Sequence, residues 1–154
     1  MFNSKNLTGE ISIGKWIEII SKHQRYYLNK NLEKYNINNG EYKILIHIYL
    51  EEGICQKDLV NILKLDKFEI AKGIKKLVKE DFISKCFDQK DRRITKLYLT
   101  DKSKKIKEEF IELLKNSSNI LTKDLTKDEI ILINNYLSKM AENIYKESNK
   151  LKNI

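Results

Sequence analysis

One stretch of the sequence, residues 82–100, constrains the fold more than any other. It reads FISKCFDQKDRRITKLYLT, in which two short runs rich in aromatic and branched residues flank the charged residues 88–93. The rest of the chain carries almost no strand signal and shows the apolar spacing of helices. Because an isolated two-stranded hairpin is barely stable in water, this one must pack against the surrounding helices. We therefore predict a mainly α-helical protein with one small β-hairpin that has a basic tip.

The positive charge of the chain is concentrated around this hairpin. The 154 residues have a formal net charge of +8, and residues 55–100 hold 12 Lys and Arg against 7 Asp and Glu. A surplus of this kind favours polyanionic partners such as nucleic acid. The length suits a single domain with a real core. The absence of proline and the scarcity of glycine suit long helices.

Two helices are expected ahead of the basic region. Apolar residues at helical spacing predict the first over about residues 10–35. Asn38, followed three residues later by Glu41, predicts an N-cap with a returning carboxylate. The helix that begins there extends to near Gly53 and is apolar on more than one side, which indicates a buried helix.

The next two helices have the layout of a helix-turn-helix. A short one is predicted from Gln56 to Lys64, and Asp66 with Glu69 predicts the cap of the following one. The apolar face of that following helix consists of Ile70, Ile74, Leu77 and Val78. Its opposite face carries Lys67, Lys72, Lys75, Lys76 and Lys79. Followed directly by the hairpin, this pair of helices predicts a winged helix.

The C-terminal third is predicted to form a helix toward Leu121 and a final helix capped by Thr126 and Glu129. The final helix has apolar residues at alternating spacings of three and four, as in a coiled-coil seam: Ile130, Ile133, Leu137, Met140 and Ile144. A second apolar set lies on another side of it: Leu132, Tyr136 and Tyr145. Since one small domain cannot easily cover both stripes, we expect a partner chain.

In this order of elements, the chain resembles the MarR family of bacterial transcription regulators. The most specific part is residues 55–100, with Gln56 and Leu59 in the short helix, an Asp91-x-Arg93 wing motif and a closing Leu-Thr at residues 99 and 100. The resemblance implies one MarR-like domain over residues 1–154. Within it, residues 36–100 form the winged helix-turn-helix, while residues 1–35 and 101–154 supply dimerisation helices. The implied assembly is a homodimer with one winged helix per half of an inverted repeat.

From this resemblance and the charge pattern we predict a surface that binds double-stranded DNA. Arg93 has the length and permanent charge to enter a narrow minor groove, and Asp91 could hold its guanidinium by a charge-assisted pair. In the alternative interpretation, Asp91 and Arg93 only pin the turn. The predicted DNA-binding residues are Gln56, Lys67, Phe68, Glu69, Ala71, Lys72, Lys75, Lys76, Lys90, Asp91, Arg92 and Arg93.

Three residues depart from the pattern of the family. Phe68 and Glu69 stand where small hydroxyl residues are usual at the start of the recognition helix. Phe68 could pack on a thymine methyl, whereas Glu69 could accept from a cytosine or simply cap its helix, which is the interpretation we favour. Asp81 stands where glycine usually ends this helix, so we expect slight strain in the turn there.

Other candidate sites follow largely by analogy with the family. A small aromatic or phenolic effector is expected between the dimerisation helices and the winged helix, in a pocket formed by Trp16, Ile20, His23, Tyr27, Tyr42 and Ile46. The same residues could be plain core. The dimer contacts predicted by the apolar pattern and the resemblance are Ile13, Ile17, Ile130, Ile133, Leu137, Met140 and Ile144.

The cysteines and histidines add little chemistry. Cys55 is placed at the predicted N-cap of the short helix near Lys57, which makes it a candidate redox sensor, although a small capping residue is the simpler interpretation. Cys86 is predicted to pack as an apolar residue on a strand. His23 is expected to be a core or pocket-lining residue. We expect no metal site and no cofactor, because no cluster of ligands has suitable spacing.

The predicted function is a dimeric, sequence-specific transcriptional repressor that a small molecule or another signal releases from DNA. The alternative is a dimeric ligand-sensing or protein-interaction module whose winged helix no longer reads DNA. An enzyme is not expected, because no nucleophile–base set, phosphate loop or metal motif is present. There is no apolar run of membrane-spanning length and no signal-peptide layout, so we expect a cytoplasmic protein without a membrane partner.

Overall fold

The computed structural model of the chain describes residues 12–152. The elements are α1 (Ile13–Leu32), the 3₁₀ helix η1 (Glu33–Tyr35), α2 (Asn39–Leu50), α3 (Gln56–Leu63), α4 (Lys67–Lys79), β1 (Ile83–Phe87), β2 (Thr95–Leu99), α5 (Asp101–Lys105), α6 (Lys107–Thr122) and α7 (Lys127–Lys152). The prediction of a mainly helical chain with one small hairpin is confirmed. The chain forms two compact units, one up to Ser117 and one from Ser118. The first holds the predicted winged helix, and the second holds the end of α6 and all of α7.

Three helices begin at the capping residues that the sequence indicates. Asn38 Oδ1 accepts from Gly40 N at 2.6 Å, and Asn38 N donates to Glu41 Oε2 at 2.7 Å. The same reciprocal pattern starts α4 at Asp66 and α7 at Thr126. These local contacts satisfy backbone N–H groups that have no partner within the helix, so the starts of α2, α4 and α7 are determined by neighbouring residues.

After α4 ends at Lys79, the chain turns at Asp81, which has a positive φ of 58°. Phe82 N donates to the carbonyl of Leu77 at 2.9 Å and Asp81 N donates to that of Val78 at 3.1 Å, so the chain reverses in a tight left-handed turn. Glycine is the residue that adopts this conformation without cost. An aspartate here is mildly strained, as the sequence comparison with the family suggests, but the turn still directs the chain into β1.

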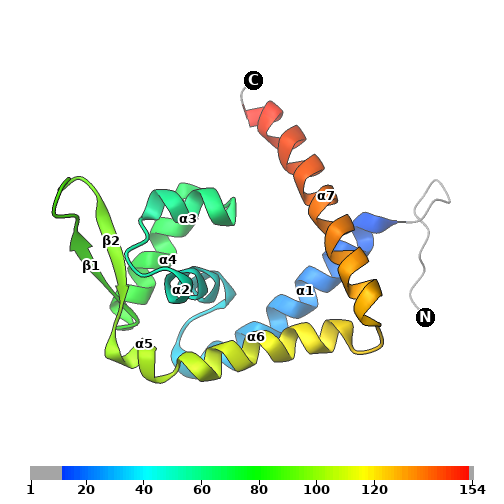
Figure 1. Cartoon of the computed structure of the whole chain (residues 1–154), viewed down its shortest axis with the longest axis horizontal. Coiled ribbons are helices and arrows are strands. Elements are labelled where there is room, and N and C mark those ends of the chain that lie inside the picture. The colour runs from blue at the N-terminus through cyan, green and yellow to red at the C-terminus, as the bar shows by residue number, and fades with distance from the viewer. Residues whose placement is uncertain (1–11, 153–154) are drawn as a thin grey trace. The chain divides into compact units, whose positions relative to one another are not determined.

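The hairpin strands pair antiparallel, with Ile83 opposite Leu99 and Phe87 opposite Thr95. A third segment, which the sequence did not predict, extends this sheet at β2. Gly53 N donates to the carbonyl of Leu97 at 2.8 Å, and Leu97 N donates to that of Ile54 at 3.1 Å. The segment between α2 and α3 thereby fixes the base of the wing to the helices. Figure 1 shows α2, α3 and α4 gathered beside the hairpin.

The core of the first unit lies between α2, α4, the hairpin and the start of α6. Its side chains are Leu28, Leu32, Ile37, Tyr42, Ile44, Leu45, Ile48, Ile54, Leu59, Ile70, Ile74, Leu77, Phe82, Ile83, Leu97 and Phe110. Helices α4 and α2 approach closely at Gly73 of α4, where a Cβ would lie only 2.4 Å from Cδ1 of Ile44 on α2. A larger residue at position 73 would push α4 away from α2 or force Ile44 to move.

The structure corrects three predictions about burial. Val78 was assigned to the apolar face of α4 but is 39% exposed, because it lies at the edge of the face that Ile74 and Leu77 bury. Cys86 is exposed rather than packed, because the two-residue period of the strand places it on the face opposite the buried Ile83. His23 is exposed in the single chain, because α1 buries only its C-terminal part.

Within residues 12–152, no helix combines the length and apolar character that crossing a membrane requires.

Candidate nucleic-acid interface

The helix-turn-helix is held together at the start of both of its helices. Gln56, the first residue of α3, donates from Nε2 to the backbone carbonyl of Lys67, the first residue of α4, at 3.3 Å. Leu59 of α3 and Ile70 and Ile74 of α4 are buried in the shared core. The contact of Gln56 therefore positions α4, whose opposite face is left in solvent.

The outer face of α4 is a stripe of one aromatic residue and three lysines. The stripe consists of four exposed residues at spacings of four, three and four: Phe68, Lys72, Lys75 and Lys79. This spacing places them on one side of a helix. Lys79 belongs to the stripe but is not in the predicted DNA-binding set. The sequence does place it on the lysine-bearing face of this helix. Lys67 is exposed and Ala71 is half-buried at the border of the stripe.

Two predicted DNA-binding residues of α4 are engaged within the protein. Glu69 accepts from Asp66 N at 3.4 Å, which is the capping role. Lys76 forms an ion pair with Glu80 at 3.0 Å, and Asn36 donates to the same carboxylate oxygen at 2.9 Å. Hydrogen bonds from Lys76 and Asn36 lower the pKa of Glu80. Glu80 thus joins the end of α4 to Asn36, just after η1, and Lys76, which pairs with Glu80, does not belong to the outer stripe.

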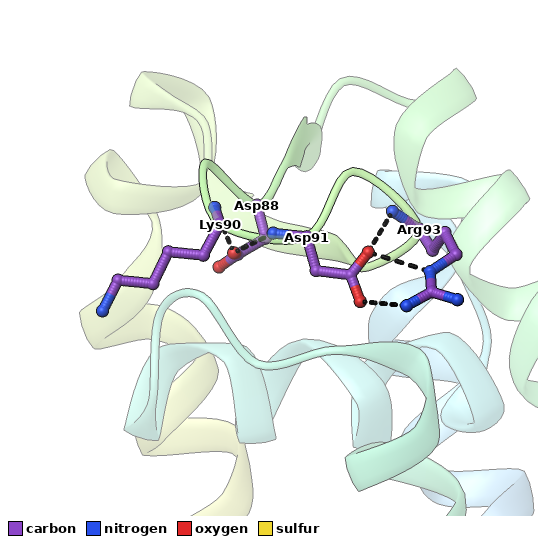
Figure 2. Close-up of polar contacts among 4 residues, drawn as sticks. All are labelled: Asp88, Lys90, Asp91 and Arg93. Carbon is purple, nitrogen blue, oxygen red and sulfur yellow. Dashed lines mark hydrogen bonds and ion pairs between the residues drawn. The ribbon is translucent and has the colours of Figure 1, made fainter.

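The tip of the hairpin is organised by Asp88, a residue that was not among the predicted site residues. Its Oδ1 accepts from the backbone N–H of Lys90 at 2.8 Å and of Asp91 at 3.0 Å (Figure 2). Its Oδ2 pairs with Lys96 Nζ at 2.7 Å. An aspartate that starts a turn in this way is a recognisable sequence signal. The Lys96 hydrogen bond, assisted by the two backbone donors, lowers the pKa of Asp88 to about 2.

Asp91 holds the arginine of the wing in a fixed orientation. The Arg93 guanidinium donates from Nε to Asp91 Oδ1 and from Nη2 to Oδ2, both at 3.1 Å (Figure 2). Arg93 N also donates to Oδ1 at 3.0 Å, so the same carboxylate pins the turn. The hydrogen bond from the Arg93 side chain is the main reason that the pKa of Asp91 is lowered. The two interpretations from sequence, holding the guanidinium and closing the turn, are therefore both present.

The held arginine nevertheless remains in solvent. The Arg93 side chain is 90% exposed, whereas that of Asp91 is 36% exposed. Lys90 and Arg92 are exposed on the same loop, and the Lys90 side chain extends away from Arg93 (Figure 2). An exposed, bidentate-paired guanidinium has lost part of its side-chain freedom before any ligand arrives. The loop thus holds three cationic side chains in solvent, one of them fixed by Asp91.

The Asp88 contacts lead to a prediction about pH. We expect the side-chain carboxyl carbon of Asp88 to titrate in NMR spectra with a midpoint of about 2, below the ordinary aspartate value of 3.8. Because the folded pKa is lowered, the contribution of Asp88 to stability is complete above about 3.8 and is lost as pH falls through about 2. Lys96→Met should raise the midpoint, since the Lys96 hydrogen bond is the largest cause of the shift. A midpoint unchanged by Lys96→Met would contradict the assignment.

Comparison with known proteins identifies the family. The family model described as transcriptional regulator SarA/Rot matches residues 27–110. The chain belongs to the SarA/Rot family of transcriptional regulators. The regulator MgrA of Staphylococcus aureus is 30% identical over 118 residues, which cover 75% of this chain and 78% of MgrA. The prediction of a transcriptional regulator rather than an enzyme is thereby confirmed.

Solved structures place the fold among the MarR regulators. A MarR regulator from Methanosarcina mazei Go1 is 34% identical with a TM-score of 0.77 over 87% of this chain and 96% of that one. A MarR family regulator from Listeria monocytogenes, solved in complex with 26mer DNA, is 27% identical with a TM-score of 0.83 over 90% and 92% of the two chains. The resemblance to MarR regulators seen in the sequence is therefore confirmed for this SarA/Rot family chain.

Within residues 12–152 of this SarA/Rot protein, the residues predicted to form an effector pocket differ in burial, and the pocket stays a prediction. Tyr42 is a core residue: it is 2% exposed and its hydroxyl donates to the carbonyl of Phe110 at 2.6 Å. Ile46 packs against the same core, Trp16 is half-buried, and Ile20 is exposed in the single chain. Tyr27 lines a groove of about 480 Å³ between α1, η1 and α6, and the other five residues are not among those that border this groove.

This groove has a mixed aromatic and acidic lining. Besides Tyr27 it is bordered by Asn31, Lys34, Tyr35, Glu108, Glu109, Phe110, Glu112, Leu113 and Asn116. Lys34 and Tyr35 both donate to the Glu109 carboxylate, which joins η1 to α6. Burial is the main reason that the pKa of Tyr35 is raised. None of these residues apart from Tyr27 was predicted, because the contacts join segments more than 70 residues apart.

Cys55 lies at the N-cap of α3, as predicted. Its Sγ donates to Asp58 Oδ2 at 2.9 Å, so the thiol contacts a carboxylate of its own helix. Cys55 and Cys86 are both free. Among residues 12–152, no group of three or more His, Cys, Asp and Glu side chains is arranged to hold a metal ion. The Cys55 contact is that of a capping residue, and redox sensing by it stays a prediction.

The residues predicted to dimerise are mainly exposed when the chain is considered alone. Five of them are exposed: Ile13 and Ile17 on α1, and Ile133, Leu137 and Ile144 on α7. The other two, Ile130 and Met140 on α7, are half-buried. The second apolar set of α7 is exposed as well: Leu132, Tyr136 and Tyr145. Helix α7 therefore leaves apolar side chains uncovered on more than one side when the chain is considered alone.

Proposed function

We propose that this chain is a sequence-specific, double-stranded-DNA-binding transcriptional regulator. It acts as a homodimeric repressor on an inverted-repeat operator and is released by a small molecule or another signal. The observation that carries the proposal is the pairing of two cationic surfaces in one unit, the lysine stripe of α4 and the Asp91-held Arg93 of the wing. The DNA-bound Listeria regulator, with a TM-score of 0.83, supports the use of this fold on DNA.

In the proposed complex, α4 enters the major groove and the wing follows the adjacent backbone. Lys72, Lys75 and Lys79 neutralise phosphates, and each phosphate contact adds about −0.9 to the slope of log K against log salt. Arg93 enters the minor groove, where an AT-rich sequence narrows the groove and strengthens the attraction for a guanidinium. Asp91 keeps that guanidinium from turning away.

The dimer is proposed from the uncovered apolar faces of α1 and α7. Burial of these side chains against a second copy removes apolar surface from water at about 25 cal/mol per Å². A two-fold assembly would present two copies of α4 to half-sites centred about one helical turn apart, roughly 10 base pairs. The effector would act by changing the spacing of these two helices.

A salt-dependent titration tests DNA binding. The full-length protein is added to a fluorescent duplex taken from upstream of its own gene, and anisotropy is followed at several salt concentrations against a scrambled duplex of equal length. We expect tight binding to the upstream duplex, a steep salt slope, and much weaker binding to the scrambled one. Equal, weak binding to both would instead favour a dimeric ligand-sensing or protein-interaction module.

Leu137→Asp is expected to weaken dimerisation on the order of 100-fold or more, because it places an unpaired charge in an apolar interface. Leu137 is 45% exposed in the single chain, so the change removes no core side chain of the protomer. Sedimentation equilibrium measures the dimer constant. Asn135→Asp is the matched control, since it adds the same charge on the opposite side of α7 and should leave the dimer intact. If Leu137→Asp dimerises as tightly as wild type, the apolar seam of α7 is not the dimer interface.

A further inference from the structure

Phe68 is the one apolar side chain in the outer stripe of α4. It is 83% exposed, and the other members of the stripe, Lys72, Lys75 and Lys79, are all cations. Single exposed apolar residues are common on protein surfaces. Phe68 differs from those because it lies at the start of a helix whose outward face is otherwise charged.

The first turn of α4 fixes where Phe68 lies. Asp66 Oδ1 accepts from Phe68 N at 2.7 Å, and Asp66 N donates to Glu69. Both carboxylates at the start of α4 therefore take part in the cap, which directs them toward the backbone of their own turn. Ala71 is half-buried and has no polar side-chain atom. Within this turn, Phe68 has the largest side chain that is free to meet a ligand.

We propose that Phe68 reads thymine through its C5-methyl group in the major groove. This rests on the proposed function, in which the start of α4 faces base edges. A phenyl ring has no hydrogen-bonding atom, so it can discriminate bases only by an apolar feature. The single apolar group that the major groove displays is the thymine methyl. The lysines beside Phe68 attract the DNA whatever its sequence, and Phe68 selects a thymine in each half-site.

The test removes that methyl and nothing else. A preferred sequence is first selected from a pool of random duplexes with the full-length dimer. Each thymine of the preferred sequence is then replaced in turn by 2′-deoxyuridine, and binding of wild type and Phe68→Ala is measured by anisotropy. At one thymine in each half-site, we expect wild type to bind the uridine duplex about fourfold more weakly, the effect of one buried methyl group. Phe68→Ala should bind both duplexes equally.

Two further variants separate recognition from general effects. Phe68→Leu keeps an apolar side chain and should keep part of the preference for thymine. Leu50→Ala removes a 77% exposed side chain at the end of α2, outside the stripe and the wing. This variant should keep the full preference for thymine. Alanine is a strong helix former, so Phe68→Ala should fold like wild type.

The outcomes distinguish this inference from the proposed function on which it rests. Sequence-selective, salt-dependent binding without any thymine-to-uridine effect, or with the same effect in Phe68→Ala, would overturn the role of Phe68 and leave the proposed function standing. Failure to bind any duplex would overturn both. Loss of the uridine effect in Phe68→Ala alone supports the assignment.

Discussion

Arg93→Ala is expected to weaken operator binding about 100-fold while the protein stays folded. A guanidinium placed in a groove contributes about 1–3 kcal/mol, and the dimer would lose one from each of its two wings. The side chain is 90% exposed and its hydrogen bonds are to Asp91, so its removal leaves no cavity. Anisotropy titration of the operator at several salt concentrations measures the loss, and thermal unfolding monitors the fold.

Two controls define what Arg93 contributes. Arg25→Ala removes the same charge from an exposed position on α1 and should change binding by less than about threefold, since distant charges are screened. Arg93→Lys keeps the charge but loses the two parallel bonds to Asp91, so an intermediate loss is expected. An Arg93→Ala protein that binds as tightly as wild type at every salt concentration would show that the wing does not contact DNA.

Phe110→Ala should lower the free energy of unfolding by about 3–5 kcal/mol, as expected when a fully buried phenyl ring is removed. Phe110 is 0% exposed, and its ring centroid lies 4.9 Å from that of Tyr35 and 5.5 Å from that of Tyr42. The rings of Tyr49 and Phe82 complete the cluster at 6.3 and 6.1 Å. Urea unfolding followed by circular dichroism gives the change, at a fixed protein concentration because a dimer is expected.

Phe87→Ala is the matched control for this loss. It deletes the same side chain from a position that is 72% exposed, so we expect a change within about 0.5 kcal/mol. Equal destabilisation by the two substitutions would mean that Phe110 does not hold α6 to the core. The comparison needs no assumption about DNA binding, and it therefore tests the packing alone.

Features that depend on neighbouring residues could be predicted from the sequence. The starts of α2, α4 and α7 follow from side chains that reach a backbone N–H two or three residues away, as Asn38 and Glu41 do. The Asp91–Arg93 pair is also local, because its partners are two residues apart. In each case the interacting groups are close in every conformation near the native one, so residue type and spacing carry enough information.

Features that depend on distant residues could not be predicted. Lys34 donates to Glu109, 75 residues away in the chain, and Asn36 donates to Glu80, 44 residues away. Tyr42 looked like a pocket wall, yet its ring packs on Phe110 and its hydroxyl bonds to that residue's carbonyl. Which lysine is paired and which aromatic residue is buried is set by the partners that folding brings close.

The sequence by itself therefore determined the order of the elements, the caps of the helices and the Asp91–Arg93 pair of the wing. Only the tertiary structure decided the third segment that pairs with β2 through Gly53 and Ile54, the exposure of Cys86, and the groove around Tyr27. The reason is physical. A cap or a turn is a contact within a few residues, whereas burial and cavities result from the packing of segments that are far apart in the chain.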